Sequence, residues 1–163
     1  MDTDSTLAPV VRGTDEGEQR WFYGGGVHTW KATSEETGGA FLLFEDRMDK
    51  GKVTPLHTHP ADETMYVLEG DILVHLNGQE CRVGAGGMVI APREVPHAFR
   101  VMSDRTRVLC FQTPGGGDAF YLDASEPIGP DGTFAETVDF DRIRASAEKN
   151  GGVTLLGPPP FAD

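Results

Sequence analysis

The sequence has little cysteine, few basic residues and no long apolar run. Its 163 residues include two cysteines, too few for a disulfide framework, so the fold has to rest on a hydrophobic core. Lys and Arg total 14 against 26 Asp and Glu, a formal net charge of −12. An acidic surface repels phosphate backbones and anionic lipid, so we expect neither nucleic acid nor a membrane as a partner.

Targeting signals are also absent from the sequence. Residues 1–10 carry no basic segment followed by an apolar one, and no stretch reaches the roughly 18 apolar residues of a membrane span. We therefore expect a cytoplasmic protein. Cys81 and Cys110 each lie in an apolar, strand-like run, and we expect both thiols to be buried.

What the chain does have is turn formers and short strand patterns. The 21 glycines and 11 prolines indicate many tight turns. From residue 54 to 113, short apolar runs recur at spacings near ten residues with no helical pattern between them. Asn77-Gly78 between two such runs predicts a tight hairpin, because type I′ turns need positive φ at both central residues. The pattern predicts an all-β sandwich or barrel.

The two ends of the chain differ from this middle. Residues 1–20 are polar and acidic, and we expect a flexible N-terminal arm. Residues 21–117 are predicted to form the barrel, and residues 118–163 a C-terminal helical extension packed on it. In that extension, 138–150 has helical periodicity before Gly151, and 118–124 reads as a helical turn capped by Asp118.

Four side chains form a candidate metal site. His57 and His59 alternate along an extended segment and so point to the same face. Glu63 follows the turn at residues 60–62, where a returning strand brings its carboxylate back toward the pair. His97 starts a later strand and supplies a third imidazole. Three imidazoles and one carboxylate suit a divalent Fe, Ni, Co, Mn, Cu or Zn ion better than Ca²⁺ or Mg²⁺.

The spacing of these residues resembles the two motifs of the cupin superfamily. The first, G-x5-H-x-H-x3-E-x6-G, is matched by Gly51, His57, His59, Glu63 and Gly70. The second, G-x5-P-x-G-x2-H-x3-N, is matched at Gly86, Pro92 and His97, whereas Glu94 and Val101 replace its second Gly and its Asn. The resemblance implies a cupin-type jelly-roll β-barrel in which the four candidate side chains hold one divalent transition metal ion.

The candidate site leaves two roles open for Glu63. It can remain a metal ligand, or it can act as the catalytic base that accepts a substrate proton. Strand alternation suggests a wall for a small aromatic or enolic substrate, and the candidate substrate-binding residues are Met65, Phe99, Phe41 and Phe111. His28 and His75 lie at the wrong spacing for the site, and we expect structural or surface roles for them.

Several segments resemble quercetin 2,3-dioxygenase-like cupins in particular, among them 37–41, 63–70, 95–100, 113–116 and 155–159. That resemblance implies a dioxygenase that cleaves a flavonol or related enolic aromatic with O2, with Glu63 as ligand and base. The alternatives are a non-oxidative metal-dependent enzyme (a polyketide cyclase, isomerase or decarboxylase) and a small-molecule-binding cupin. The resemblance also implies a homodimer, for which the aromatic segment 21–30 offers a surface.

Overall fold

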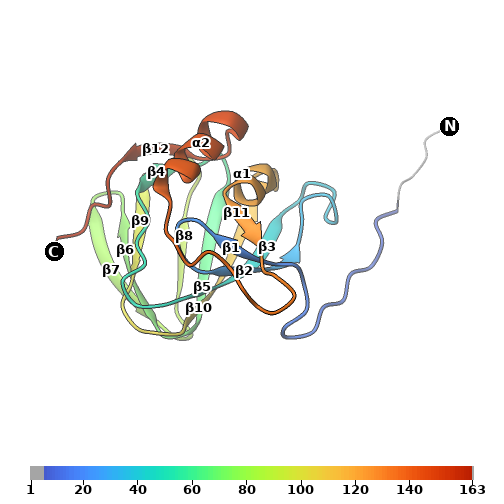
Figure 1. Cartoon of the computed structure of the whole chain (residues 1–163). Helices are drawn as coiled ribbons and strands as arrows, with labels where there is room; N and C mark the ends of the chain where they lie inside the picture. The colour runs from blue at the N-terminus through green and yellow to red at the C-terminus, as the bar shows by residue number, and fades with distance from the viewer. Residues whose placement is uncertain (1–5, 163) are drawn as a thin grey trace.

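The computed structural model describes residues 6–162, and these form two antiparallel sheets folded face to face (Figure 1). The larger sheet has seven strands in the order β11 (Ser125–Pro127), β1 (Gln19–Phe22), β2 (Val27–Ala32), β3 (Leu42–Met48), β10 (Thr106–Thr113), β5 (Asp62–Glu69) and β8 (Met88–Ala91). The smaller has five, β12 (Thr154–Gly157), β4 (Leu56–Thr58), β9 (His97–Val101), β6 (Asp71–Leu76) and β7 (Gln79–Gly84). The jelly-roll β-barrel expected from the sequence is confirmed.

Strict alternation along the strands builds the core between the sheets. In β3, Leu42, Phe44 and Met48 are buried while their neighbours along the strand are more exposed, and β10 alternates in the same way. Alternate residues of a strand point to opposite faces, so each strand supplies one row of side chains to the interior. Asp46 occupies an interior position of this row, between Phe44 and Met48.

The hairpin predicted at Asn77-Gly78 joins β6 to β7. Both residues have positive φ, 49° and 81°, as a type I′ turn requires. The hairpin leaves β7 at the edge of the smaller sheet, where most of its residues are exposed. Cys81 is therefore exposed, and the prediction that both thiols are buried is wrong for it and confirmed for Cys110.

The N-terminal segment enters the barrel earlier than predicted. Gln19 and Arg20 already belong to β1, so the arm expected over residues 1–20 overlaps the first strand. Before β1, Arg12 forms an ion pair with Glu36, and Lys31 Nζ donates to backbone carbonyls at residues 13, 14 and 16. These contacts fasten residues 12–16 to the end of β2. Trp21 and Trp30, expected at a dimer surface, are buried instead, with exposed fractions of 9% and 3%.

The C-terminal extension contains both expected helices, α1 (Asp118–Asp123) and α2 (Phe140–Asn150). The cap predicted for α1 is wrong, because the Asp118 carboxylate accepts hydrogen bonds from Ser34 instead. Asp139 caps α2 by accepting from the Arg142 N–H, and Gly151 ends it with φ of 64°. The extension also adds β11 to one sheet and β12 to the other. It thus completes both sheets as well as covering one end of the barrel, where α2 and β12 lie beside β4 (Figure 1). Neither α1 nor α2, in the part of the chain described, is long and apolar enough to cross a bilayer.

Candidate metal centre

The structure brings together all four of the side chains that the sequence singles out as metal ligands. One ligand atom from each of His57, His59, Glu63 and His97 lies within 4.8 Å of the others. His57 is on β4, His59 follows that strand, His97 is on β9, and Glu63 comes from β5 in the facing sheet. The turn at residues 60–61 carries the chain from one sheet to the other and so closes the cluster. His59, Glu63 and His97 are buried, and His57 is partly buried.

The three imidazoles are held in one tautomer by backbone carbonyls. Each Nδ1 lies 2.7–2.8 Å from a carbonyl oxygen, in the pairs His57–Pro55, His59–Ala61 and His97–Val95. A carbonyl oxygen only accepts, so each Nδ1 carries a hydrogen and each Nε2 is the ring atom left to bind a metal. Backbone contacts of this kind orient metal-ligating histidines in general.

Glu63 completes the set of electron-pair donors. Its Oε2 lies 3.1 Å from Nε2 of His59 and 3.1 Å from Nε2 of His97. Once these Nε2 atoms are deprotonated, as metal ligation requires, three imidazole lone pairs and a carboxylate face one another. Ligand atoms about 2.1 Å from a metal and at right angles are about 3.0 Å apart, close to the spacing here. The donor set and its spacing therefore fit a divalent transition metal ion.

In the metal-free cluster, the pKa shifts of His57 and Glu63 favour a neutral imidazole and an ionised carboxylate, the forms that bind a metal ion. Burial and the neighbouring His97 lower the pKa of His57 to about 4, so this imidazole is neutral near pH 7. Burial alone would raise the pKa of Glu63, but hydrogen bonds from His59 and His97 outweigh it and hold that pKa well below its usual range. Burial would also lower the pKa of His59, yet Glu63 raises it above the ordinary value. Glu63 is thus an ionised carboxylate inside the barrel.

The turn before His97 is preserved although Glu94 replaces a Gly of the second motif. Glu94 adopts φ of 62°, a left-handed conformation that Gly favours. Its backbone N–H donates to the His59 carbonyl at 2.9 Å, which ties the turn before His97 to the His57–His59 segment. The substitution therefore keeps the backbone path that places His97 in the cluster.

Comparison with known proteins agrees with this geometry. A family model described as "Cupin domain" matches residues 44–111, which include all four cluster residues. The chain belongs to the cupin superfamily. The Bacillus subtilis quercetin 2,3-dioxygenase is 30% identical to this cupin over 120 residues, which are 73% of the chain. The match covers 35% of that relative, so the chain spans about one third of its length.

Solved structures share the cupin fold at lower identity. KdgF from Halomonas sp. superposes with a TM-score of 0.60 at 20% identity, covering 66% of this chain and 94% of that one. An RmlC-like cupin from Shewanella frigidimarina gives 0.60 at 19% identity, covering 68% and 96%. A predicted oxalate decarboxylase from Thermotoga maritima gives 0.57 at 21% identity, covering 65% and 99%. At these identities the likeness concerns the fold.

Sequence reasoning missed two residues beside the cupin's cluster, one in contact with Glu63 and the other in contact with the first. Gln112, on β10, is the cross-strand partner of Glu63, and its Nε2 lies 3.4 Å from Glu63 Oε1. The same Nε2 donates to the hydroxyl of Tyr121, on α1, at 2.7 Å. A polar residue directly after the apolar run 108–111 was the available signal for Gln112. Tyr121 gave none, because its helix packs on the barrel from a distant segment.

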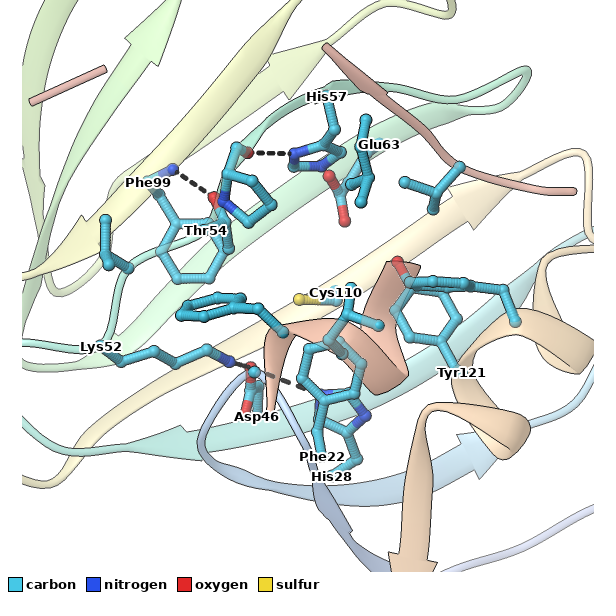
Figure 2. Close-up of a pocket in the computed structure, with 18 of the residues that line it drawn as sticks. Phe22, His28, Asp46, Lys52, Thr54, His57, Glu63, Phe99, Cys110 and Tyr121 are labelled. Carbon is cyan, nitrogen blue, oxygen red and sulfur yellow. Dashed lines mark hydrogen bonds and ion pairs between the residues drawn. The ribbon is translucent and has the colours of Figure 1, made fainter. Parts of the chain in front are cut away.

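Next to the cluster the barrel encloses a cavity of about 70 Å³ (Figure 2). His57 and Glu63 lie on its wall, together with Phe99, Cys110 and Tyr121. Helix α2 and the segment after it contribute apolar side chains to the lining, namely Phe140, Ile143, Val153 and Leu155. The cluster thus opens onto a largely apolar and aromatic space.

Of the four candidate substrate-binding residues, one lines the cavity and three do not. Phe99 lines the cavity, whereas Met65 is 1% exposed and packs in the core without reaching it. Phe41 and Phe111 do not line it either, and their rings pack on each other with centroids 5.0 Å apart. Their strands turn the alternate residues inward, Leu42 and Phe44 from β3 and Cys110 and Gln112 from β10. Alternation assigns residues to the two faces of a strand but does not identify the interior face. The prediction of Phe41 and Phe111 as cavity residues assumed the wrong face.

The two histidines outside the motifs also differ from each other. His75, on β6, is partly buried, and its ring meets Phe161 edge-on. His28 is 2% exposed, lies between the rings of Phe22 and Phe44, and lines the cavity. The structural or surface role expected for His28 does not account for its place on the cavity wall.

Proposed function

We propose that this cupin is a metal-dependent dioxygenase that cleaves a flavonol such as quercetin, or a related enolic aromatic, with O2. The observation that carries the proposal is the convergence of three imidazoles and an ionised Glu63 beside an aromatic cavity, with His57 and Glu63 on its wall. The similarity to the Bacillus subtilis quercetin 2,3-dioxygenase supports the choice of substrate class.

The four clustered side chains would hold the metal ion. His57, His59, Glu63 and His97 would hold one Fe, Ni, Co, Mn, Cu or Zn ion, since mixed imidazole and carboxylate sets suit these metals. When bound, the ion supplies Lewis acidity and open coordination positions for oxygen atoms.

Within this proposal, Glu63 receives the proton of the substrate hydroxyl. Its Oε2 faces the imidazoles, while its Oε1 faces Gln112 at 3.4 Å, a long contact that leaves this oxygen free to accept the proton. The Gln112 amide donates both to Glu63 and to Tyr121, so it fixes the direction of the carboxylate. The apolar walls keep water away from the reacting carbon atoms.

Cavity size restricts how a flavonol would enter. The space of about 70 Å³ is well below the roughly 300 Å³ of pockets that bind drug-sized ligands. Because α2 and β12 line the cavity through Phe140, Ile143 and Leu155, a three-ring substrate requires these segments to move outward. A single-ring enol requires a smaller displacement, and this favours a non-oxidative enzyme acting on a small substrate as the second candidate.

Oxygen uptake separates these two functions. The protein is loaded in turn with Fe, Ni, Co, Mn and Cu, its metal content is verified, and quercetin is added in air. Dioxygenase activity requires loss of the flavonol's visible absorbance with matching consumption of O2, absent from the metal-free protein and strongly reduced in E63Q. If no loaded form consumes O2, the dioxygenase proposal fails; conversion of a small enolic acid without O2 would then favour the non-oxidative enzyme.

A further inference from the structure

A second polar cluster lines the cavity away from the metal ligands. Lys52 Nζ donates to Asp46 Oδ2 at 2.6 Å, and His28 Nε2 lies 3.5 Å from the same oxygen. All three side chains are at most 5% exposed. In Figure 2, His57 and Glu63 lie at one side of the pocket, and Lys52, Asp46 and His28 at the other, with Cys110 drawn between them.

The position of this cluster is unusual for a barrel interior. Asp46 takes an inward position on β3, and His28 stands directly opposite it on β2. Burying a lysine and a carboxylate costs solvation energy that their attraction only partly offsets, and apolar side chains of similar volume commonly serve stability as well. A role in stability alone therefore explains the cluster poorly.

The cluster has hydrogen-bonding capacity left over. Among the described residues only Asp46 accepts from the Lys52 ammonium, whose nitrogen otherwise lies 5.4 Å and 5.5 Å from the ring centroids of Phe22 and Phe99. Asp46 Oδ1 and His28 Nδ1 are buried and have no partner in residues 6–162. An ammonium has three N–H donors, so the cluster keeps both unused donors and unused acceptors.

The charge of the cluster selects the kind of group that fits. Burial would raise the pKa of Asp46, but Lys52 and His28 outweigh it and lower that pKa, so the carboxylate is ionised. Burial lowers the pKa of His28, which leaves its imidazole neutral. The pair Lys52–Asp46 therefore has no net charge. A bound carboxylate would leave an uncompensated negative charge there, whereas a neutral hydroxyl can accept from Lys52 and donate to an unpaired acceptor.

We propose that Lys52, Asp46 and His28 form a subsite for a phenolic hydroxyl on the part of the substrate remote from the metal. This inference rests on the proposed function, since it assumes an aromatic substrate that reaches from Glu63 to Lys52. It adds that the substrate carries a ring hydroxyl at its far end, and that Lys52 and Asp46 determine specificity for it.

A pair of single-ring probes tests the subsite without requiring turnover. Phenol and toluene have nearly the same shape and differ in the hydroxyl. Their dissociation constants are measured by NMR titration of the zinc-loaded and the metal-free protein, following the amides around Lys52 and Phe99. Replacing Lys52 alone would strand a buried carboxylate, so the variant is K52M/D46N, which removes both charges together. K50M, at an exposed lysine two residues away, is the matched control.

The expected result is a change in the ratio of the two affinities. In K52M/D46N the preference for phenol over toluene should fall at least about tenfold, because a hydrogen bond to a charged group is lost, while toluene binding stays within about twofold. K50M should keep the wild-type ratio. An unchanged ratio in K52M/D46N, in both zinc-loaded and metal-free forms, overturns the subsite. Quercetin turnover by the wild-type protein is measured separately. If the wild type does not turn over quercetin but K52M/D46N loses the preference for phenol, the dioxygenase proposal is contradicted and the subsite is supported.

Discussion

His57 and His97 are direct cross-strand partners on β4 and β9, with ring centroids 4.4 Å apart. Residues directly opposite in an antiparallel pair project to the same side of the sheet, so strand register alone sets these two imidazoles together. Glu63 then reaches the pair from the facing sheet, where its own cross-strand partner is Gln112. The ligand geometry is thus a property of the barrel's strand pairing.

Gln112 should act as a positioning residue for Glu63. In Q112L the Glu63 carboxylate loses its amide donor, and Tyr121 loses its partner. Metal content should stay near that of the wild type, whereas kcat/KM for quercetin should fall about tenfold or more. Losing a donor to the ionised form raises a carboxylate's pKa, so the acidic limb of the pH–rate profile should move to higher pH. Q79L, at an exposed glutamine on β7, is the matched control; equal effects in both variants would refute the assignment.

Gly70 should tolerate alanine far less well than Gly78. Both have similar positive φ, 78° and 81°, so the backbone strain of a side chain is alike. A Cβ at Gly70 would lie 2.2 Å from Thr106 Oγ1, whereas one at Gly78 meets nothing within 4 Å. G78A should cost about 1 kcal/mol and G70A at least twice that, measured as free energy of unfolding in urea. Equal costs would show that the close approach at Gly70 has no energetic weight.

The stability of the metal-free protein should depend on His57 below pH 6.5. The folded-state pKa of about 4 lies below the ordinary value, so the unfolded chain takes up this proton more readily. The stabilisation is therefore complete above pH 6.5 and is lost as pH falls toward 4. Urea unfolding of wild type and H57N from pH 7.5 to 5 should show the wild type losing stability faster. Parallel curves would contradict a depressed pKa, and H75N serves as the control for replacing a histidine.

A homodimer needs a different surface from the aromatic segment 21–30. Trp21 and Trp30 are buried, but the outer face of β5 and β8 exposes the apolar side chains Tyr66, Leu68, Met88 and Ile90. We expect light scattering to give twice the chain mass of 17.6 kDa and I90E to reduce it to one. A wild-type mass near 17.6 kDa would remove the dimer from the account.

The sequence predicts the barrel from local signals, and it predicts the four clustered side chains from the spacing of the two motifs. Alternation, the Asn77-Gly78 turn and the His57–His59 spacing act over a few residues. What it misses depends on contacts between distant segments. Which face of β3 and β10 points inward decides against Phe41 and Phe111, and the packing of α1 against the barrel decides for Tyr121. The sequence does not single out Lys52, because its ion pair with Asp46 forms only in the folded chain.

Metal content of H97A tests the central claim most directly. Wild type, H97A and the control H75A are dialysed with one divalent metal, freed of excess, and analysed by elemental mass spectrometry, with circular dichroism confirming the fold. Wild type and H75A should retain about one ion per chain, and H97A less than about one tenth of that, because second-sphere changes alone commonly cost 10–100-fold in metal affinity and this change removes a ligand. A folded H97A that keeps one ion per chain would contradict the assignment of His57, His59, Glu63 and His97 as a single metal site.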